Sequence, residues 1–258
     1  DISKKMMEEL TNYLPNKKYA IRWKLDSTKY SFIDFKGYEA GKKPSEISGK
    51  PRLFYDRNKP FTRKVKFFDT YKADKEIIIP TYYVIPKSEG KIIENLKRNQ
   101  IKFKELQSDS LITVESYKIV DFKTVKNPYE GHYLHFDTQV SSELKTKKFR
   151  KGDYLVSTKQ SGVKFLLETL EPEAVDSYFN WNFFDGILGQ KEYFSDYVFE
   201  DTAAELLKTN KALKTAFELK KASDAKFAED GAAQLDWVYK NSEYYEGSVN
   251  QYPIYRIR

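Results

Sequence analysis

The sequence contains no cysteine and only two histidines among 258 residues. The lack of cysteine excludes disulfide bonds, thiolate-bound zinc and a cysteine nucleophile. The G-x-x-x-x-G-K-[ST] phosphate loop, the G-x-G-x-x-G dinucleotide motif and the G-x-S-x-G nucleophile turn are also absent. No apolar run approaches the roughly 20 residues that cross a bilayer, so we expect no membrane span. Composition and motifs therefore single out no reaction.

The sequence has a diffuse positive charge and many aromatic residues. It carries 45 Lys and Arg against 38 Asp and Glu, a formal charge of +7, and 16% of its residues are aromatic. This content is typical of a folded protein. A scattered positive balance favours anionic surfaces such as cell-wall polymers or acidic peptides. Because no basic stripe or binding motif accompanies it, we expect no nucleic-acid partner.

Residues 15–157 alternate apolar and polar side chains, as half-buried strands do. Strands are expected from residue 19 onward, with one ending at Gly37 and a loop over residues 41–51. The aromatic and β-branched content predicts an antiparallel, sandwich-like front. Within it, residues 80–106 have the length and pattern of a strand–helix–strand unit.

From residue 158 the pattern becomes helical. Apolar residues recur at helical spacing, and Asn210 and Asp224 are predicted caps that divide the stretch into short helices. The final run, residues 252–258, predicts a closing strand. The fold class that follows is α+β, with a C-terminal cluster of short helices.

The predicted division of the chain has three parts. Residues 1–14 are a connecting helix, residues 15–157 the β-rich region, and residues 158–258 a mainly helical region packed on it. The chain starts at Asp1 rather than Met and shows no signal peptide. We therefore expect a piece of a longer precursor.

The two histidines, His132 and His135, are the weak candidates for a metal site. In a strand, residues three apart point to opposite faces, so both imidazoles cannot reach one ion without a bulge or turn. Structural or surface histidines are the favoured interpretation. Any zinc site would need carboxylates from elsewhere in the chain.

Nine aromatic rings gather between Glu171 and Glu200. One hypothesis is an exposed platform for sugars or peptides, with Tyr178, Trp181 and Phe184 as contacts. The favoured alternative is that these rings join helices to sheet, because Phe and Trp are mostly buried. Residues 55–61 are predicted to be a polar turn first, and an anion or peptide contact through Arg57 second.

Several stretches resemble the C-terminal region of a subgroup of bacterial zinc carboxypeptidases of the carboxypeptidase A type, typical of Bacteroidetes-like bacteria. They are LEPEAVDSYFNWNFFDGILGQKEYFSDYVFED, AAQLDWVYKNSEYYEG, PSEISGKPRLFYDRNKPF, PTYYVIP, NPYEGHYLHFD and KGDYLV. The similarity runs from about Lys18 to the C-terminus. It implies export to the periplasm or beyond, and a peptidase domain of the same precursor as partner.

The resemblance also implies an absence of catalytic residues. That family holds zinc with His-x-x-Glu and a distant His, and neither His132 nor His135 has Glu three residues later. We therefore carry over no catalytic residue, metal or cofactor. The leading hypothesis is a non-catalytic accessory region that packs on the peptidase domain or helps present peptide or cell-wall glycan. The alternatives are an independent carbohydrate- or peptide-binding module and an enzyme that uses a carboxylate pair with His135.

Overall fold

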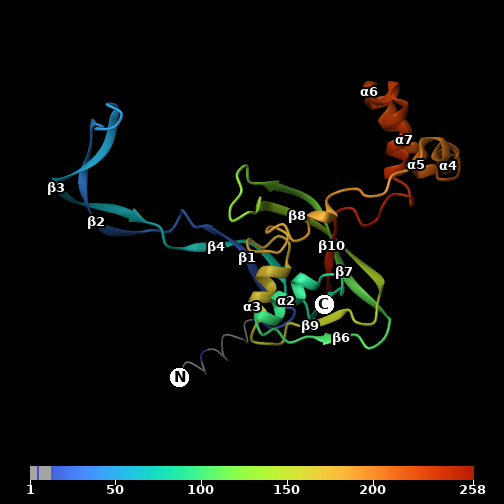
Figure 1. Cartoon of the computed structure of the whole chain (residues 1–258), viewed down its shortest axis with the longest axis horizontal. Helices are drawn as coiled ribbons and strands as arrows, with labels where there is room; N and C mark the ends of the chain where they lie inside the picture. The colour runs from blue at the N-terminus through green and yellow to red at the C-terminus, as the bar shows by residue number, and fades with distance from the viewer. Residues whose placement is uncertain (1–4, 6–12) are drawn as a thin grey trace. The chain divides into compact units, whose positions relative to one another are not determined.

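The computed structural model describes residue 5 and residues 13–258 (Figure 1). Antiparallel sheets together with a group of C-terminal helices confirm the α+β class. Contacts divide the described residues into two compact units, residues 18–78 and residues 13–17 with 79–258. The boundary predicted at residue 158 differs from these limits, because it was placed where the sequence pattern changes from strands to helices. The helix predicted over residues 2–14 lies almost wholly outside the described residues.

Residues 18–78, here called the arm, form one long hairpin of four strands (Figure 1). β1 (Lys18–Leu25) pairs with β4 (Tyr71–Ile78), and β2 (Ser31–Pro44) pairs with β3 (Pro51–Phe67). Both pairs are antiparallel and two-stranded. Asp26 joins them, because its amide donates to the Thr70 carbonyl at 2.8 Å and its carboxylate accepts from Thr28.

The prediction that a strand ends at Gly37 is wrong. β2 continues through Gly37 to Pro44, and the predicted loop over residues 41–51 shrinks to the turn between Pro44 and Pro51. The ring of Phe61 lies over Gly37, where an added Cβ would come within 2.8 Å of it. Aromatic rings that cover a strand glycine compensate for its missing side chain. The predicted polar turn over residues 55–61 lies within β3, where the register with β2 shifts.

The other unit contains a six-stranded sheet in which all neighbouring strands are antiparallel. The predicted closing strand is confirmed as β10, and it lies at the centre of the sheet, paired with β5 and β7. The antiparallel strands predicted for residues 15–157 are divided between this sheet and the two strand pairs of the arm. In order across the sheet, the strands are β6 (Lys104–Glu105), β9 (Tyr154–Ser157), β5 (Tyr82–Ile85), β10 (Gln251–Ile257), β7 (Ser110–Thr124) and β8 (His135–Phe149).

The predicted strand–helix–strand unit is present as β5, α2 (Gly90–Arg98) and β6. β9 pairs antiparallel with both strands, so β5 and β6 run in the same direction with β9 between them. α3 (Val163–Leu170) follows β9. Its last carbonyl, that of Leu170, accepts a hydrogen bond from the Tyr252 hydroxyl at 2.8 Å, which ties this helix end to β10.

Four helices near the C-terminus share a core of their own. Asn210, Asp224 and Asp230 cap three of them by accepting from the backbone amide three residues later, which confirms the two predicted caps. Among the described residues, no helix combines the length and apolarity needed to cross a bilayer. The helices are α4 (Asp196–Thr209), α5 (Lys211–Ser223), α6 (Ala225–Glu229) and α7 (Gly231–Lys240), and their buried residues are Phe199, Ala203, Leu213, Phe217, Phe227, Val238 and Tyr239.

Candidate functional site

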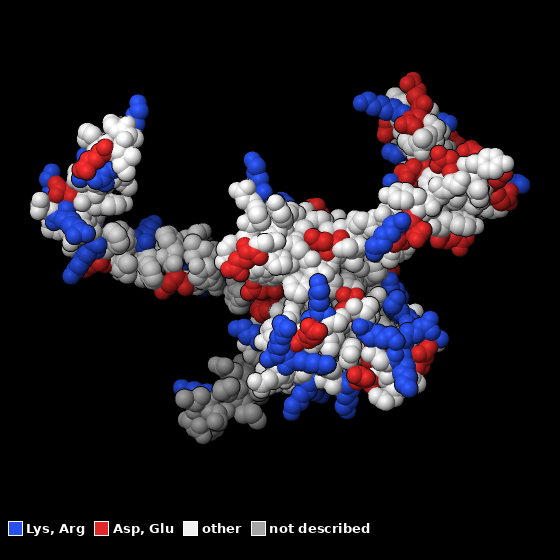
Figure 2. Space-filling view, in the orientation of Figure 1, with Lys and Arg blue, Asp and Glu red and all other residues white. Residues whose placement is uncertain are grey.

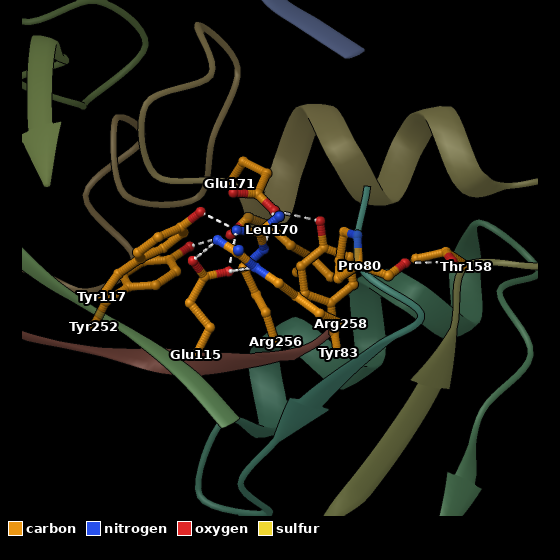
Figure 3. Close-up of polar contacts among 10 residues, drawn as sticks. All are labelled: Pro80, Tyr83, Glu115, Tyr117, Thr158, Leu170, Glu171, Tyr252, Arg256 and Arg258. Atoms are coloured by element: carbon orange, nitrogen blue, oxygen red, sulfur yellow. Dashed lines mark hydrogen bonds and ion pairs between the residues drawn. The ribbon is translucent and has the colours of Figure 1, made fainter. Parts of the chain in front are cut away.

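A network of buried charges lies around the centre of the six-stranded sheet (Figure 3). Glu115 on β7, Glu171 after α3 and Arg256 on β10 are each less than 5% exposed. Arg256 Nη1 donates to Glu115 Oε2 at 2.6 Å, and its Nε lies 3.0 Å from Glu171 Oε1. The guanidinium of Arg258 also donates to Glu115, with its Nε 3.1 Å from Oε2. The buried guanidinium of Arg256 therefore contacts two carboxylates. The half-exposed guanidinium of Arg258 is a second cationic partner of Glu115.

Tyrosine hydroxyls complete this network. Tyr83 donates to Glu171 Oε1 at 2.5 Å, and the Tyr117 hydroxyl accepts from Arg256. Burial, together with the charge of Glu171, raises the pKa of Tyr83 and of Tyr117, so both phenols keep their protons. Burial also raises the pKa of Glu171, against the opposing effect of Arg256. The hydrogen bonds and ion pairs of this network connect β5, β7, β10 and the end of α3. Among the charged side chains of the network, only that of Arg258 is open to solvent.

His135, the first residue of β8, is the centre of a second polar cluster. Its Nδ1 lies 2.9 Å from Thr124 Oγ1, and its Nε2 lies 3.1 Å from Asp185 Oδ1 and 3.2 Å from Asn182 Nδ2. The imidazole is buried and packs on Phe179, with 5.1 Å between ring centroids. Both ring nitrogens are engaged, and the contacts join the β7–β8 connection to the 3₁₀ turn η2 (Asp185–Ile187).

Thr124, His135 and Asp185 form a hydroxyl–imidazole–carboxylate series, a set of groups that can move a proton in other settings. The structure places the carboxylate of Asp185 next to His135, and this contact was not predicted from the sequence. Reaction chemistry at His135 stays a prediction.

The three rings proposed as ligand contacts differ in exposure. Tyr178 and Phe184 are 6% and 4% exposed, so they belong to the core that the sequence favoured for this segment. Trp181 is half-buried, and its Nε1 donates to Asp176 Oδ1 at 3.2 Å. The ring of His132 stands edge-on to Trp181 at 5.5 Å. Of the three rings, Trp181 is the one that a ligand can reach.

The two histidines do not converge. His132 lies in the connection between β7 and β8, where its backbone bridges Tyr129, and His135 faces Asp185. β8 begins at His135, and the chain turns before it at Glu130 and Gly131, which both have positive φ. Within residue 5 and residues 13–258, no three His, Asp or Glu side chains group in a way that could hold a metal ion.

The arm differs from the rest of the chain in charge and in exposure. Residues 18–78 hold 16 Lys and Arg against 8 Asp and Glu, a formal charge of +8, while the rest of the sequence holds 29 against 30, a charge of −1. Basic side chains, Arg57 among them, are exposed on the part formed by β2 and β3 (Figure 2). Only Ile21, Asp26 and Ile77 are buried in the arm. It contains 12 of the 26 exposed large apolar residues found in the described chain: Trp23, Leu25, Tyr30, Phe32, Ile33, Phe35, Tyr38, Ile47, Leu53, Tyr55, Phe67 and Tyr71.

The register of β2 and β3 sorts their side chains into two faces, because directly opposed residues share a face. Ile33 opposes Val65, Phe35 opposes Arg63, and Gly37 opposes Phe61. The rings of Phe35 and Phe61 lie 6.3 Å apart, and Arg63 stacks on Phe61 at 4.1 Å. We call this the apolar face of the arm, formed by Ile33, Phe35, Phe61, Arg63, Val65 and Phe67. The opposite face, here called the basic face, contains Lys36, Lys64 and Lys66 together with the rings of Phe32 and Tyr38.

Comparison with protein-family models, with curated proteins and with solved structures found no match for this chain. The resemblance to zinc carboxypeptidases therefore stays a prediction.

Sequence reasoning did not find the buried charge network, although part of its signal is visible. Glu115 lies in the apolar run of β7, and Arg256 lies between Tyr255 and Ile257 in the closing strand. A charged residue inside an apolar strand is expected to have a buried partner. The partners themselves are 141 residues apart, and sequence alone does not pair them.

Proposed function

We propose that this chain is a non-catalytic accessory region of an exported zinc carboxypeptidase-like protein, which packs on the peptidase domain or helps to present its substrate. The observation that carries the proposal is the arm. A hairpin with almost no buried residues and many exposed apolar and basic ones is a surface suited to contact with another domain. The resemblance along residues 18–258 supports a peptidase as that domain, and export to the periplasm or outside the cell.

The test compares the full-length protein with residues 1–258 alone. We expect the full-length protein to bind zinc and release C-terminal amino acids from peptides, and the chain alone to do neither. Zinc content by elemental analysis and peptide cleavage by mass spectrometry are the measurements. Stoichiometric zinc and peptide hydrolysis by the purified chain would contradict the proposal.

A second candidate function is supported by the surroundings of Trp181. Its partly exposed ring lies next to His132 and to Tyr129, whose ring centroid is 6.4 Å away. Stacked aromatics of this kind suit sugars and peptides. Trp181 fluorescence, isolated by replacing Trp23 and Trp237 with Phe, should change on titration with cell-wall glycan fragments or peptides. An unchanged spectrum would remove this alternative.

A further inference from the structure

We infer that the apolar face of the arm docks on an acidic, partly apolar surface of a folded protein. The inference rests on the proposed function, in which that surface belongs to the peptidase domain. It goes further by naming the face that binds and the chemistry that it meets. Phe35, Phe61 and Arg63 form its centre, since aromatic residues and arginine are the usual hot spots of protein interfaces.

The hairpin of β2 and β3 has no core of its own. Each strand has one partner, and every residue from 31 to 67 is exposed or half-buried. Two-stranded hairpins are at best marginally stable in water, and they need a third strand or a packed face to persist. Phe35 is 51% exposed and Phe67 is 45% exposed. A partner that covers this face would supply the missing core.

The charge of the hairpin selects an acidic partner. Glu39 pairs with Arg63 and Asp56 with Lys59, but eight other basic residues make no ion pair with any residue that the structure describes. A second copy would bring another arm of charge +8 against the first, and like charges facing each other oppose association. Five of the eight, Lys42, Lys43, Lys50, Arg52 and Arg57, lie toward the turn of the hairpin, and the other three, Lys36, Lys64 and Lys66, lie on the basic face.

The pattern favours protein over nucleic acid or lipid. Ile33 and Val65 form an aliphatic pair on the apolar face, and phosphates offer such a pair nothing to pack against. In lipid, the unpaired amides and carbonyls on the outer edges of a two-stranded hairpin would lack partners. A protein surface can bury the apolar face and still leave these edges in water or pair with them.

Hydrogen exchange on the full-length protein tests the inference. Backbone amides of residues 31–67 should exchange more slowly in the full-length protein than in the chain of 258 residues alone. Phe35→Ala in the full-length protein should speed their exchange by about tenfold, the loss expected for a hot-spot aromatic. Tyr197→Ala on α4 is the matched control, since that ring is 91% exposed and should have no effect.

Charge and location are tested in parallel. Arg52→Glu should speed exchange in the arm, because Arg52 opposes Lys43, which the alternation of β2 places on the same side as Phe35 and Gly37. Lys164→Glu, at an exposed position of α3, should not. A photoreactive phenylalanine analogue at position 35 should cross-link to an acid-rich segment of the partner domain. The same analogue at position 197 should give no cross-link to that segment.

The outcomes separate the inference from the proposed function. Protection of the arm and cross-links to a domain that is not a peptidase would support the inference and overturn the proposed function. A zinc peptidase domain together with fast exchange of the arm in the full-length protein would overturn the inference and keep the proposed function. A full-length protein without another folded domain and with an unprotected arm would overturn both. Phe35-dependent binding to phosphatidylglycerol vesicles, or Phe35-dependent dimers of the chain alone, would overturn the protein partner.

Discussion

Replacing Arg256 with Met is the sharpest test of how the sheet is held together. The change keeps a long apolar side chain on β10 and removes the cation between two buried carboxylates. Glu115 keeps Arg258, whereas Glu171 keeps the hydroxyl of Tyr83 but loses its salt-bridge partner. Removing one partner of a buried ion pair typically costs about 3–5 kcal/mol of unfolding free energy, and we expect a loss of this size near pH 7.

The pH dependence gives the prediction its sign. The pKa of Glu171 is already raised by burial above its ordinary 4.5, and without Arg256 it rises further. A group whose pKa is raised by folding adds stability below its unfolded pKa and loses it as the pH rises through the folded pKa. The deficit of Arg256→Met should therefore shrink between pH 7 and about pH 4.5, with a limiting slope of about 1.4 kcal/mol per pH unit for one proton.

Urea denaturation followed by tryptophan fluorescence, repeated across this pH range, measures both effects. The double variant Arg256→Met/Glu171→Gln should regain at least part of the unfolding free energy that Arg256→Met loses at pH 7. Its deficit should not shrink as the pH falls, because it lacks the carboxyl group of Glu171. Arg258→Met is the matched control, since that half-exposed guanidinium leaves Glu115 with Arg256 and should cost about 1 kcal/mol or less. A loss below about 1 kcal/mol in Arg256→Met, or a pH profile parallel to that of the wild type, would refute the reasoning.

Three further predictions follow from other parts of the chain. Phe199→Ala opens a cavity in the helical core and should cost about 3–5 kcal/mol in thermal or urea unfolding, and a cost near zero would contradict that core. His135→Ala removes the contacts to the η2 turn and should cost about 1–3 kcal/mol, more than His132→Ala, so equal costs would contradict the assignment. The Lys151 amide and nearby cations lower the pKa of Asp109 to about 2, so its stabilising contribution should be present above its ordinary 3.8 and fade toward pH 2. Asp109→Asn should not show this loss of stability toward pH 2. A dependence of its unfolding free energy on pH identical to that of the wild type would contradict the assignment.

Local patterns in the sequence predicted the elements whose structure is decided locally. The side chains of Asn210 and Asp224 accept from amides three residues later, so a cap can be found from spacing alone. The alternating run at residues 252–258 predicted a strand, and β10 occupies residues 251–257. Burial of Tyr178 and Phe184 likewise follows from the size and apolarity of the rings.

Features that depend on distant residues were not predicted. Gly37 by itself signals the end of a strand, but β2 continues through it, covered by the ring of Phe61, 24 residues later. The contact between His135 and Asp185 joins residues 50 apart and depends on the fold that brings β8 to the η2 turn. The arm carries a formal charge of +8. The total charge of +7 does not reveal that this charge is concentrated in the arm, because basic and acidic residues nearly balance in the rest of the chain.

The place of β10 in the sheet has a consequence for synthesis. β10 lies between β5 and β7, yet the ribosome makes it only after the four helices α4–α7. Until then the facing edges of β5 and β7 are open, and Glu115 and Glu171 have no Arg256 between them. Open strand edges are sites of aggregation. Nascent chains, and products of translation that stops between α3 and β10, should therefore depend on chaperones or be degraded.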